Sequence, residues 1–324
     1  MIFADVLEIK NGRNQKAVEN PNGKYPIYGS GGIMGYADDY ICDADTVIVG
    51  RKGSINNPIF VDEPFWNVDT AFGLEAKQGV LLPRYLYYFC KHFDFNRLNK
   101  AVTIPSLTKG DLLKIEIGLP SIEEQYRVVD KLSEIEEIMG LRRQELQKLD
   151  DLIKARFVEM FYDKDYPVLK WNDVFSTTTG KLDSNAAVYS GEYPFFTCSK
   201  EVLRIDKYAF VQEALLLAGN NAAGKYDVKY YNGKFNAYQR TYVLGLKEDW
   251  SYRLFQYQLE DKLLYLQQQS LGGLTKYLTL KILGELEFII PPKDKQEEFE
   301  LFVAQTDKSK FATMSTGRYC TKGR

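Results

Sequence analysis

The sequence has few of the residues that most often bind metals or attack substrates. It contains one histidine, His92, and four cysteines among 324 residues. A lone imidazole supplies neither a histidine metal site nor a catalytic triad. The cysteines, Cys42, Cys90, Cys198 and Cys320, show no CxxC spacing. They therefore indicate reduced cytosolic thiols, not a disulfide framework or a zinc site, and we expect no metal.

Long hydrophobic runs and an excess of one charge are also missing. No run of about 18 apolar residues occurs, so we expect no segment that spans a membrane. The opening MIFADVLEIKNG carries charges and lacks an apolar signal core, which argues against secretion and favours a cytoplasmic protein. The formal net charge is −2, from 42 basic and 44 acidic residues, so any basic surface must be local.

The chain does have a globular composition. Hydrophobic residues make up 45% of it and aromatic residues 14%. A length of 324 residues indicates two domains, each large enough to bury a core.

One segment, EALLLAGNNAAGKYDV, has the glycine and lysine spacing of a phosphate-binding loop. Such a loop needs a Ser or Thr after its lysine and then a helix. Here Tyr226 takes that position, and the next residues, with Asn232-Gly233 as a turn, predict a β-hairpin. The sequence favours a plain strand-to-strand loop. A nucleotide-dependent switch that uses residues Gly219 to Lys225 stays open as an alternative.

The pattern around this loop occurs twice in the chain. Each copy has an apolar strand that ends in Gly50 or Gly219, a short loop with Lys or Arg, and then an aromatic–Asn pair. The matched segments are 3–13 with 171–181, 23–28 with 191–196, 45–76 with 213–247, and 106–125 with 277–296. A repeat of about 125 residues is far longer than a solenoid unit, so it indicates a domain duplication.

A long helix is predicted between the copies. Ser121 precedes Glu123 and Glu124, acids that suit a helix N-terminus. Apolar residues then recur at three- and four-residue steps, which is typical of a coiled-coil seam that needs a partner helix. The seam residues are Leu132, Ile135, Met139, Leu146, Leu149, Ile153 and Phe157. About 40 residues at ~1.5 Å each give a rod of roughly 60 Å. The alternative is an amphipathic helix lying on one domain.

The predicted fold class is therefore α/β (α+β), with two similar domains joined by a long coiled-coil helix. The expected bounds are residues 1–120 for the first domain, 121–163 for the spacer helix and 164–293 for the second domain. Two similar domains on a rod suit an extended polymer that is recognised at two places, such as duplex DNA, whose equivalent grooves recur every 34–36 Å or so.

The order of motifs resembles a known family. YPIYGSGGIMGY, DTVIVGRKGS, PFWNVDTAFGL and IPSLTKGDLLKIEIGLPSIEEQ, followed by a long helix, resemble the specificity (HsdS-like) subunit of type I restriction-modification systems. The resemblance covers nearly all of residues 3–307, and the block from Ile104 to Gln125 is its most specific part. It implies two target recognition domains, each reading half of a split site in double-stranded DNA. It also implies helices that set the gap between the halves and dock methyltransferase subunits, to which a restriction subunit can be added.

The same resemblance implies a subunit without catalytic residues or cofactors. An adenine methyltransferase needs an Asn/Asp-Pro-Pro-aromatic motif and a glycine-rich cofactor loop. The only Pro-Pro pair, Pro291-Pro292, follows Ile290 and precedes Lys293, so it does not qualify. A non-catalytic protein-binding adaptor with duplicated domains stays open as an alternative.

The sequence departs from the family pattern at its C-terminal end. The pattern has a second long helix after the second recognition domain, antiparallel to the first. Here we expect a shortened distal helix at residues 294–311. The tail at 312–324 has no apolar period, so we expect it to be disordered.

The DNA contacts are expected in the loops. Phosphates are bound by Lys, Arg and backbone N–H groups, whereas base edges are read by planar groups such as those of Arg, Asn and Gln. In the first copy the candidates are Ser30, Arg51, Lys52, Ser54, Asn56, Asn57, Ser106 and Lys109. In the second they are Ser199, Lys200, Asn220, Asn221, Lys225, Tyr238, Gln239, Arg240, Thr275, Lys276 and Tyr277. Because these loops differ most between the copies, we expect two different half-sites.

Overall fold

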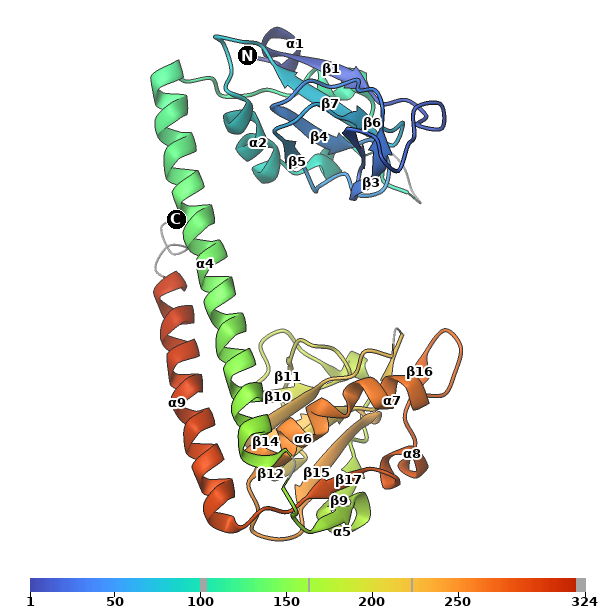
Figure 1. The fold of residues 1–324 in the computed structure, drawn as a ribbon, viewed down its shortest axis with the longest axis vertical. Helices are drawn as coiled ribbons and strands as arrows, with labels where there is room; N and C mark the ends of the chain where they lie inside the picture. The colour runs from blue at the N-terminus through green and yellow to red at the C-terminus, as the bar shows by residue number, and fades with distance from the viewer. Residues whose placement is uncertain (100–103, 163, 223, 319–324) are drawn as a thin grey trace. The chain divides into compact units, whose positions relative to one another are not determined.

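The computed structural model of the chain describes residues 1–99, 104–162, 164–222 and 224–318. The chain divides into two compact units, Met1–Gly140 and Leu141–Arg324. The division falls inside one 40-residue helix, α4 (Ile122–Phe161), so each unit includes part of it (Figure 1). The predicted long helix and the mixed helix–sheet fold class are confirmed.

Unit 1 places its helices beside two small sheets. The strands form one sheet in the order β1-β7-β4-β5 and another in the order β3-β2-β6. The elements are α1 (Phe3–Val6), β1 (Leu7–Asn11), β2 (Tyr25–Gly29), β3 (Gly32–Ala37), β4 (Thr46–Gly50), β5 (Ile59–Val61), β6 (Trp66–Asn67), β7 (Ala71–Ala76), α2 (Pro83–His92), a 3-10 turn (Phe95–Leu98) and α3 (Lys109–Leu112).

Unit 2 is built around a six-stranded sheet in the order β11-β10-β14-β12-β15-β9, with α6 across one face (Figure 1). Two short pairs, β13-β16 and β17-β8, lie beside it. The elements are β8 (Val168–Lys170), α5 (Trp171–Val174), β9 (Phe175–Thr179), a 3-10 turn (Ser184–Ala186), β10 (Tyr193–Phe196), β11 (Leu203–Ile205), β12 (Phe210–Ala218), β13 (Asn220–Asn221), β14 (Val228–Ala237), β15 (Thr241–Leu246), α6 (Tyr252–Asp261), α7 (Leu263–Gln269), β16 (Lys276–Tyr277), α8 (Leu280–Gly284), β17 (Glu287–Ile289) and α9 (Lys293–Arg318).

The two units repeat the same strand pairings. In unit 1, β1 pairs antiparallel with β7 so that Leu7 faces Ala76. In unit 2, β9 pairs with β15 so that Phe175 faces Leu246, which is the equivalent pair. Each unit also has one parallel pair, β2 with β6 and β10 with β14. The duplication predicted from sequence is therefore present in the backbone register.

The register corrects one detail of the repeat. Gly50 ends β4 opposite Ala71, and its counterpart opposite Thr241 is Ala218, the last residue of β12. The sequence comparison had matched Gly50 with Gly219. Gly219 instead corresponds to Arg51, because their N–H groups donate to the equivalent carbonyls of Arg240 and Thr70, both at 2.8 Å.

Two glycines in equivalent positions are required by close backbone approach. A Cβ on Gly12 would lie 1.8 Å from the carbonyl oxygen of Val68, and one on Gly180 would lie 1.7 Å from that of Ala237. No side chain fits at these distances, so both copies need glycine where the first strand ends.

The apolar runs of β4 and β12 are buried on both faces of their sheets. In β12, Leu215 and Leu217 face the core under α6, while Leu216 belongs to a second cluster on the opposite face with Phe235 and Val243. Because side chains alternate along a strand, a strand covered on both sides needs a continuous apolar run. This explains the ALLLA segment that leads into the glycine loop.

The predicted hairpin turn at Asn232-Gly233 is wrong. Residues Val228–Ala237 form one continuous strand, β14, which pairs with β12 from Leu217↔Val228 to Phe210↔Phe235. Gly233 continues the strand with a φ of +140°, a conformation that glycine adopts without strain. The actual hairpin is β12–β14, and the glycine–lysine segment is its loop.

The start of α4 has the predicted cap. The Ser121 hydroxyl accepts the Glu124 N–H at 3.3 Å, and the Glu124 carboxylate accepts the Ser121 N–H at 3.3 Å, which forms a capping box. Within unit 1 the helix then contacts α2, because Tyr88 and Lys91 donate to the Glu136 carboxylate at 2.9 and 2.8 Å.

The second part of the α4 seam packs inside unit 2. Ile153 is fully buried with Leu254, Phe299 and Val303. α9 runs antiparallel alongside (Figure 1), since Arg156 contacts Glu298 at 2.7 Å and Asp150 contacts Lys310 at 2.6 Å. The other seam residues are half-buried at Leu132, Leu146, Leu149 and Phe157, and exposed at Ile135 and Met139.

The distal helix is shorter than α4, as predicted, but longer than the predicted 294–311. α9 has 26 residues and ends at Arg318, so residues 312–318 of the predicted disordered tail are helical. Residues 319–324 lie outside the described part. Thr306 and Thr313 bond their hydroxyls to carbonyls one turn back, at 3.0 and 3.1 Å. The ion pair between Lys310 and Asp150 ties this end of α9, which lacks an apolar stripe, to α4.

A buried glutamine holds the helices together in each unit. Gln125 in unit 1 is 0% exposed, accepts the Leu82 N–H at 2.9 Å and donates to the Pro120 carbonyl at 3.1 Å. Gln296 in unit 2 is 2% exposed, accepts the Ser251 N–H at 2.9 Å and donates to the Pro291 carbonyl at 2.8 Å. The recurrence of both bonds indicates that the glutamine is part of the repeated frame.

We expect Gln296→Ala to lower the free energy of unfolding of the full chain by about 1–3 kcal/mol. The substitution leaves the Ser251 N–H and the Pro291 carbonyl buried without their partner. Denaturant unfolding followed by circular dichroism measures the change. Gln268→Ala, at an exposed position of α7, is the matched control and should stay within about 0.5 kcal/mol of wild type. Equal effects of the two variants would contradict the role given to Gln296.

Among the helices of the described ranges, none combines the length and apolar character needed to cross a membrane.

Candidate nucleic-acid interface

In unit 1, backbone bonds bring the loop after β4 against the segment that precedes α3. The Leu107 N–H donates to the Arg51 carbonyl at 2.9 Å, and the Gly53 N–H donates to the Pro105 carbonyl at 3.0 Å. Lys52 and Ser106 form an isolated antiparallel bridge. Two segments that lie about fifty residues apart in the sequence therefore form one surface.

The turn between β2 and β3 joins this surface. A Cβ built on Gly50 would lie 3.1 Å from the Cβ of Ser30, so Ser30 sits against the end of β4. The exposed candidates in the neighbouring loop are Arg51, Lys52 and Ser54, and Asn57 is exposed further along it. Two cations and several hydroxyl groups thus gather at one edge of unit 1.

The side chains of two unit 1 candidates, Asn56 and Lys109, are hydrogen-bonded to other residues of the same unit. The Asn56 amide donates to the Asp94 carboxylate at 3.0 Å, and its carbonyl oxygen accepts the Phe95 N–H at 2.7 Å. The Lys109 ammonium donates to the Ile9 carbonyl at 2.7 Å. Both side chains hold loops in place, so their polar groups are already bonded, although Asn56 is exposed.

Unit 2 repeats the same connection. The Leu278 N–H donates to the Gly219 carbonyl at 2.8 Å, the counterpart of the Leu107–Arg51 bond. Asn220 and Asn221 pair with Tyr277 and Lys276 as the strands β13 and β16. The segment before α8 therefore lies beside the loop after β12, as its counterpart does in unit 1.

A third loop of unit 2 reaches the same place. The Gly219 N–H donates to the Arg240 carbonyl at 2.8 Å, and the Cys198 thiol donates to the same oxygen at 3.4 Å. The Tyr238 N–H donates to the Phe196 carbonyl at 2.9 Å. These bonds join the loops after β10, β12 and β14, and the β13–β16 pair adds the segment before α8, so all four segments that carry the second copy's candidates meet.

The candidates of unit 2 differ in how free their side chains are. The hydroxyl of Ser199 accepts the Glu201 N–H at 3.3 Å, and the amide of Gln239 lies 3.5 Å from the Asp183 carboxylate. The exposed candidates are Ser199, Lys200, Lys225, Gln239, Arg240, Thr275 and Tyr277, and the half-buried ones are Asn220, Asn221, Tyr238 and Lys276. Four cations therefore lie among hydroxyl and amide groups.

The glycine–lysine loop lacks the geometry of a phosphate-binding loop. It connects two antiparallel strands, β12 and β14, and so does not lead into the helix that a phosphate-binding loop requires. Tyr226, where a magnesium-binding hydroxyl would stand, is only 7% exposed, and burial raises the pKa of its phenol. The predicted strand-to-strand loop is confirmed.

The sequence analysis missed one pair of basic residues. Arg13 and Lys181 are both exposed and directly follow the required glycines Gly12 and Gly180. The Arg13 N–H donates to the Asn67 carbonyl at 2.8 Å, and next to Lys181 the Leu182 carbonyl accepts the Gln239 N–H at 2.9 Å. Their recurrence in both copies was the signal that would have identified them.

Two of the cysteines, Cys42 and Cys90, are buried. Burial raises the pKa of the Cys42 thiol to about 12 and raises that of Cys90 as well. Across the described residues, the His, Cys, Asp and Glu side chains form no group of three that could hold a metal ion. Cys320 lies outside the described part.

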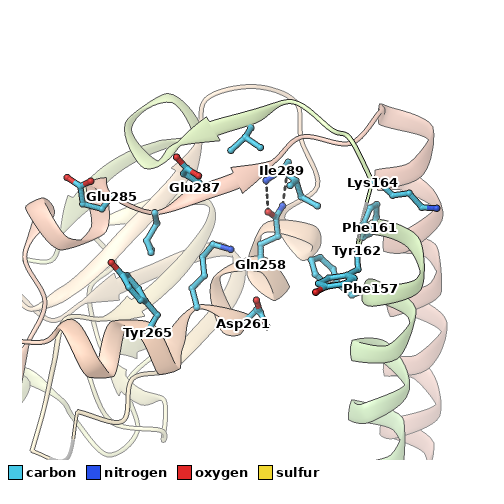
Figure 2. A pocket seen from close by; sticks show the side chains of 13 residues that line it. Phe157, Phe161, Tyr162, Lys164, Gln258, Asp261, Tyr265, Glu285, Glu287 and Ile289 are labelled. Carbon is cyan, nitrogen blue, oxygen red and sulfur yellow. Dashed lines mark hydrogen bonds between the residues drawn. The ribbon is translucent and has the colours of Figure 1, made fainter.

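Unit 2 also contains a cavity of 660 Å³ (Figure 2). It opens between the end of α4, α6 and β17, where Gln258 exchanges two hydrogen bonds with Ile289 at 3.0 and 2.8 Å. Asp261, Lys262 and Glu287 give it charges of both signs, and burial lowers the pKa of Lys262. None of its lining residues belongs to the loops described above.

The sequence is similar to those of known proteins. The chain is 34% identical over 153 residues to the type I restriction enzyme EcoDI specificity subunit of Escherichia coli. The aligned region covers 45% of this chain and 33% of that protein. It is 26% identical over 217 residues to the putative type I specificity subunit S.MpnORF365P of Mycoplasma pneumoniae, covering 62% of this chain and 78% of that one. The chain thus matches only a third of the length of EcoDI.

The fold has a solved relative as well. The type I restriction-modification system S subunit from M. genitalium superposes with a TM-score of 0.64 at 16% identity, over 99% of this chain and 92% of that one. The family described as type I restriction modification DNA specificity domain matches residues 3–151 and again residues 163–317. This chain therefore belongs to the type I restriction-modification DNA specificity family and carries two copies of its domain.

Proposed function

We propose that the chain is the subunit that reads a split site in double-stranded DNA, each unit contacting one half. The observation that carries the proposal is a shared frame with different side chains. The same bond ties Leu107 to Arg51 and Leu278 to Gly219, yet the loops read GRKGSINN in one copy and GNNAAGKY in the other. A common frame fixes the position of each loop, and different loops select different bases.

The proposed contacts follow from exposure and chemistry. The exposed lysines Lys52, Lys181 and Lys225 suit phosphates, because an ammonium group brings charge without a planar hydrogen-bonding edge. Exposed Arg13 is assigned to a phosphate as well, because it directly follows the frame glycine Gly12 and does not lie at a loop tip. Within the described part of the chain, Arg240 is bonded through its backbone carbonyl, and its exposed guanidinium is available to meet a base edge.

The proposal extends to partners. Ile135 and Met139 on α4 remain 42% and 48% exposed, which suits a helix face that docks methyltransferase subunits, to which a restriction subunit is added. Catalysis would reside in those subunits, with this chain supplying recognition from domains at residues 1–120 and 164–293. We place the complex in the cytoplasm, where a bacterial cell keeps the DNA that such a complex would modify.

Replacing residues 1–119 with a foreign recognition domain should change one half of the methylated motif and leave the other intact. The replaced segment ends before the capping box of α4, so the helix cap and the contacts within unit 2 stay in place. Co-expression with the methyltransferase, followed by methylation sequencing of the host DNA, measures the motif.

A change in both halves, or in neither, would contradict modular recognition. A gel shift of the full chain with random-sequence duplexes distinguishes the proposed DNA-reading subunit from the alternative of a protein-binding adaptor. A protein-binding adaptor selects no DNA sequence, whereas the proposed subunit enriches one.

A further inference from the structure

The loop between α7 and β16 in unit 2 is a tight hairpin with a defined shape (Figure 1). The Leu271 N–H donates to the Tyr277 carbonyl at 3.0 Å, and the Tyr277 N–H donates to the Leu271 carbonyl at 2.9 Å. Gly272 has a φ of +99°, and a Cβ there would lie 2.3 Å from the Thr275 carbonyl oxygen. The hairpin is therefore closed at its base and requires glycine at its turn.

The tip of this hairpin carries a bare leucine. Leu274 is 96% exposed, against 66% for Leu264 on the adjacent α7 and 58% for Leu280 on α8. A leucine held out from a closed hairpin gains nothing from the fold, since its side chain buries almost no area. Exposed apolar groups on a well-formed support often mark a contact with another molecule.

The neighbours of Leu274 indicate the chemistry of that molecule. Thr275 is exposed beside it, and Lys276 follows in β16, which pairs with Asn221 of β13. Lys276 also lies against the glycine–lysine loop, because a Cβ on Gly224 would lie 3.3 Å from its Cγ. A single apolar tip set among cations, amides and hydroxyls fits a nucleic acid better than an apolar protein surface.

We propose that Leu274 enters the base stack of the duplex that unit 2 reads and partly unstacks one base step. This inference rests on the proposed function. An apolar wedge fits between bases because both are apolar on their faces, and the surrounding cations hold the phosphates on either side. Flexible pyrimidine–purine steps unstack at the lowest cost, so the wedge would add sequence preference at a step without hydrogen-bonded base contacts.

The test uses the full chain alone, so that no methyltransferase contributes to unstacking. Duplexes retained by the wild-type chain from a random-sequence pool are sequenced, and the enriched duplex is treated with permanganate, which oxidises unstacked thymines. We expect the wild type to raise the reactivity of thymines at one step. Leu274→Ala should return that reactivity to the level of free DNA. It should also weaken binding of the duplex roughly tenfold, because the apolar contact between the leucine and the bases is lost.

Leu264→Ala is the matched control, because Leu264 is an exposed leucine outside the hairpin. It should alter neither the permanganate pattern nor the affinity, and Leu274→Phe should preserve both. Unchanged permanganate reactivity in Leu274→Ala overturns the wedge, whether or not the affinity falls. If Leu274→Ala no longer co-purifies with the methyltransferase but keeps the wild-type permanganate reactivity, the wedge is also overturned and the hairpin is assigned to a protein contact. A wild type that retains no duplex defeats the proposed function itself, and the wedge with it.

Discussion

Inserting four residues after Gly140 should lengthen the gap between the two methylated half-sites by one or two base pairs. The insertion lies at the division between the two compact units, where a side chain built on Gly140 meets no atom within 4 Å. A site near Asp150 is less suitable, because Asp150 and Ile153 pack against α9 and α6 within unit 2.

The expected size follows from helix and duplex geometry. Four residues add roughly 6 Å and turn the downstream helix by about 40°, since they slightly exceed one 3.6-residue turn. The added length matches nearly two base pairs at ~3.4 Å each, but the duplex rotates by about 70° over that distance. The seam suffers a stutter and not a break, so some strain and a lower affinity should accompany the new gap.

Methylation sequencing of the host measures the gap, and a four-residue insertion at Tyr189 serves as the control. Tyr189 is a fully exposed loop residue of unit 2, so an insertion there adds the same residues without lengthening α4. The half-sites should stay the same in both variants, and only the insertion after Gly140 should move them apart. An unchanged gap with retained methylation would show that α4 does not set the spacing.

Arg240→Ala should relax one position of the half-site that unit 2 reads, at a cost of ~1–3 kcal/mol, or roughly 5- to 150-fold in discrimination. Truncation should leave the loop intact, because Gly219 and Cys198 bond to the Arg240 carbonyl and not to its side chain. Alanine cannot replace the two hydrogen bonds that the guanidinium would donate to guanine, so binding should depend less on which base stands at that position.

Lys225→Ala is the matched comparison on the neighbouring loop. As a phosphate contact it should weaken all sequences alike and reduce the salt dependence of binding by about one ion. Binding of the enriched duplex and of its single-base variants, at several salt concentrations, distinguishes the two effects. A uniform loss in Arg240→Ala would make it a phosphate contact. Loss of ATP binding in Lys225→Ala would instead favour the nucleotide-switch alternative.

The sequence alone determined the main features of the fold, because they depend on local and periodic signals. The continuous apolar runs of β4 and β12 predicted strands, and both are buried on two faces. Ser121 and Glu124 predicted the start of α4, and they form the capping box. Recurring glycines such as Gly12 and Gly180 made the duplication visible, since close backbone approach allows no other residue there.

Only the tertiary structure decided which candidates are free and how the loops meet. Asn56 and Lys109 are bonded to Asp94 and Ile9, partners 38 and 100 residues away that no local pattern identifies. The continuity of β14 through Gly233 depends on pairing with β12, and pairing outweighs the turn preference of Asn-Gly.

The C-terminal end of α9 and the bare tip at Leu274 were likewise decided by structure. The end of α9 is supported by an ion pair from Lys310 to Asp150, far away in the sequence. Leucine is a residue type that usually lies in the core, but the closed hairpin holds the side chain of Leu274 exposed. Burial is a property of the folded surface, so a sequence predicts which residues prefer the core but not which of them the fold leaves outside.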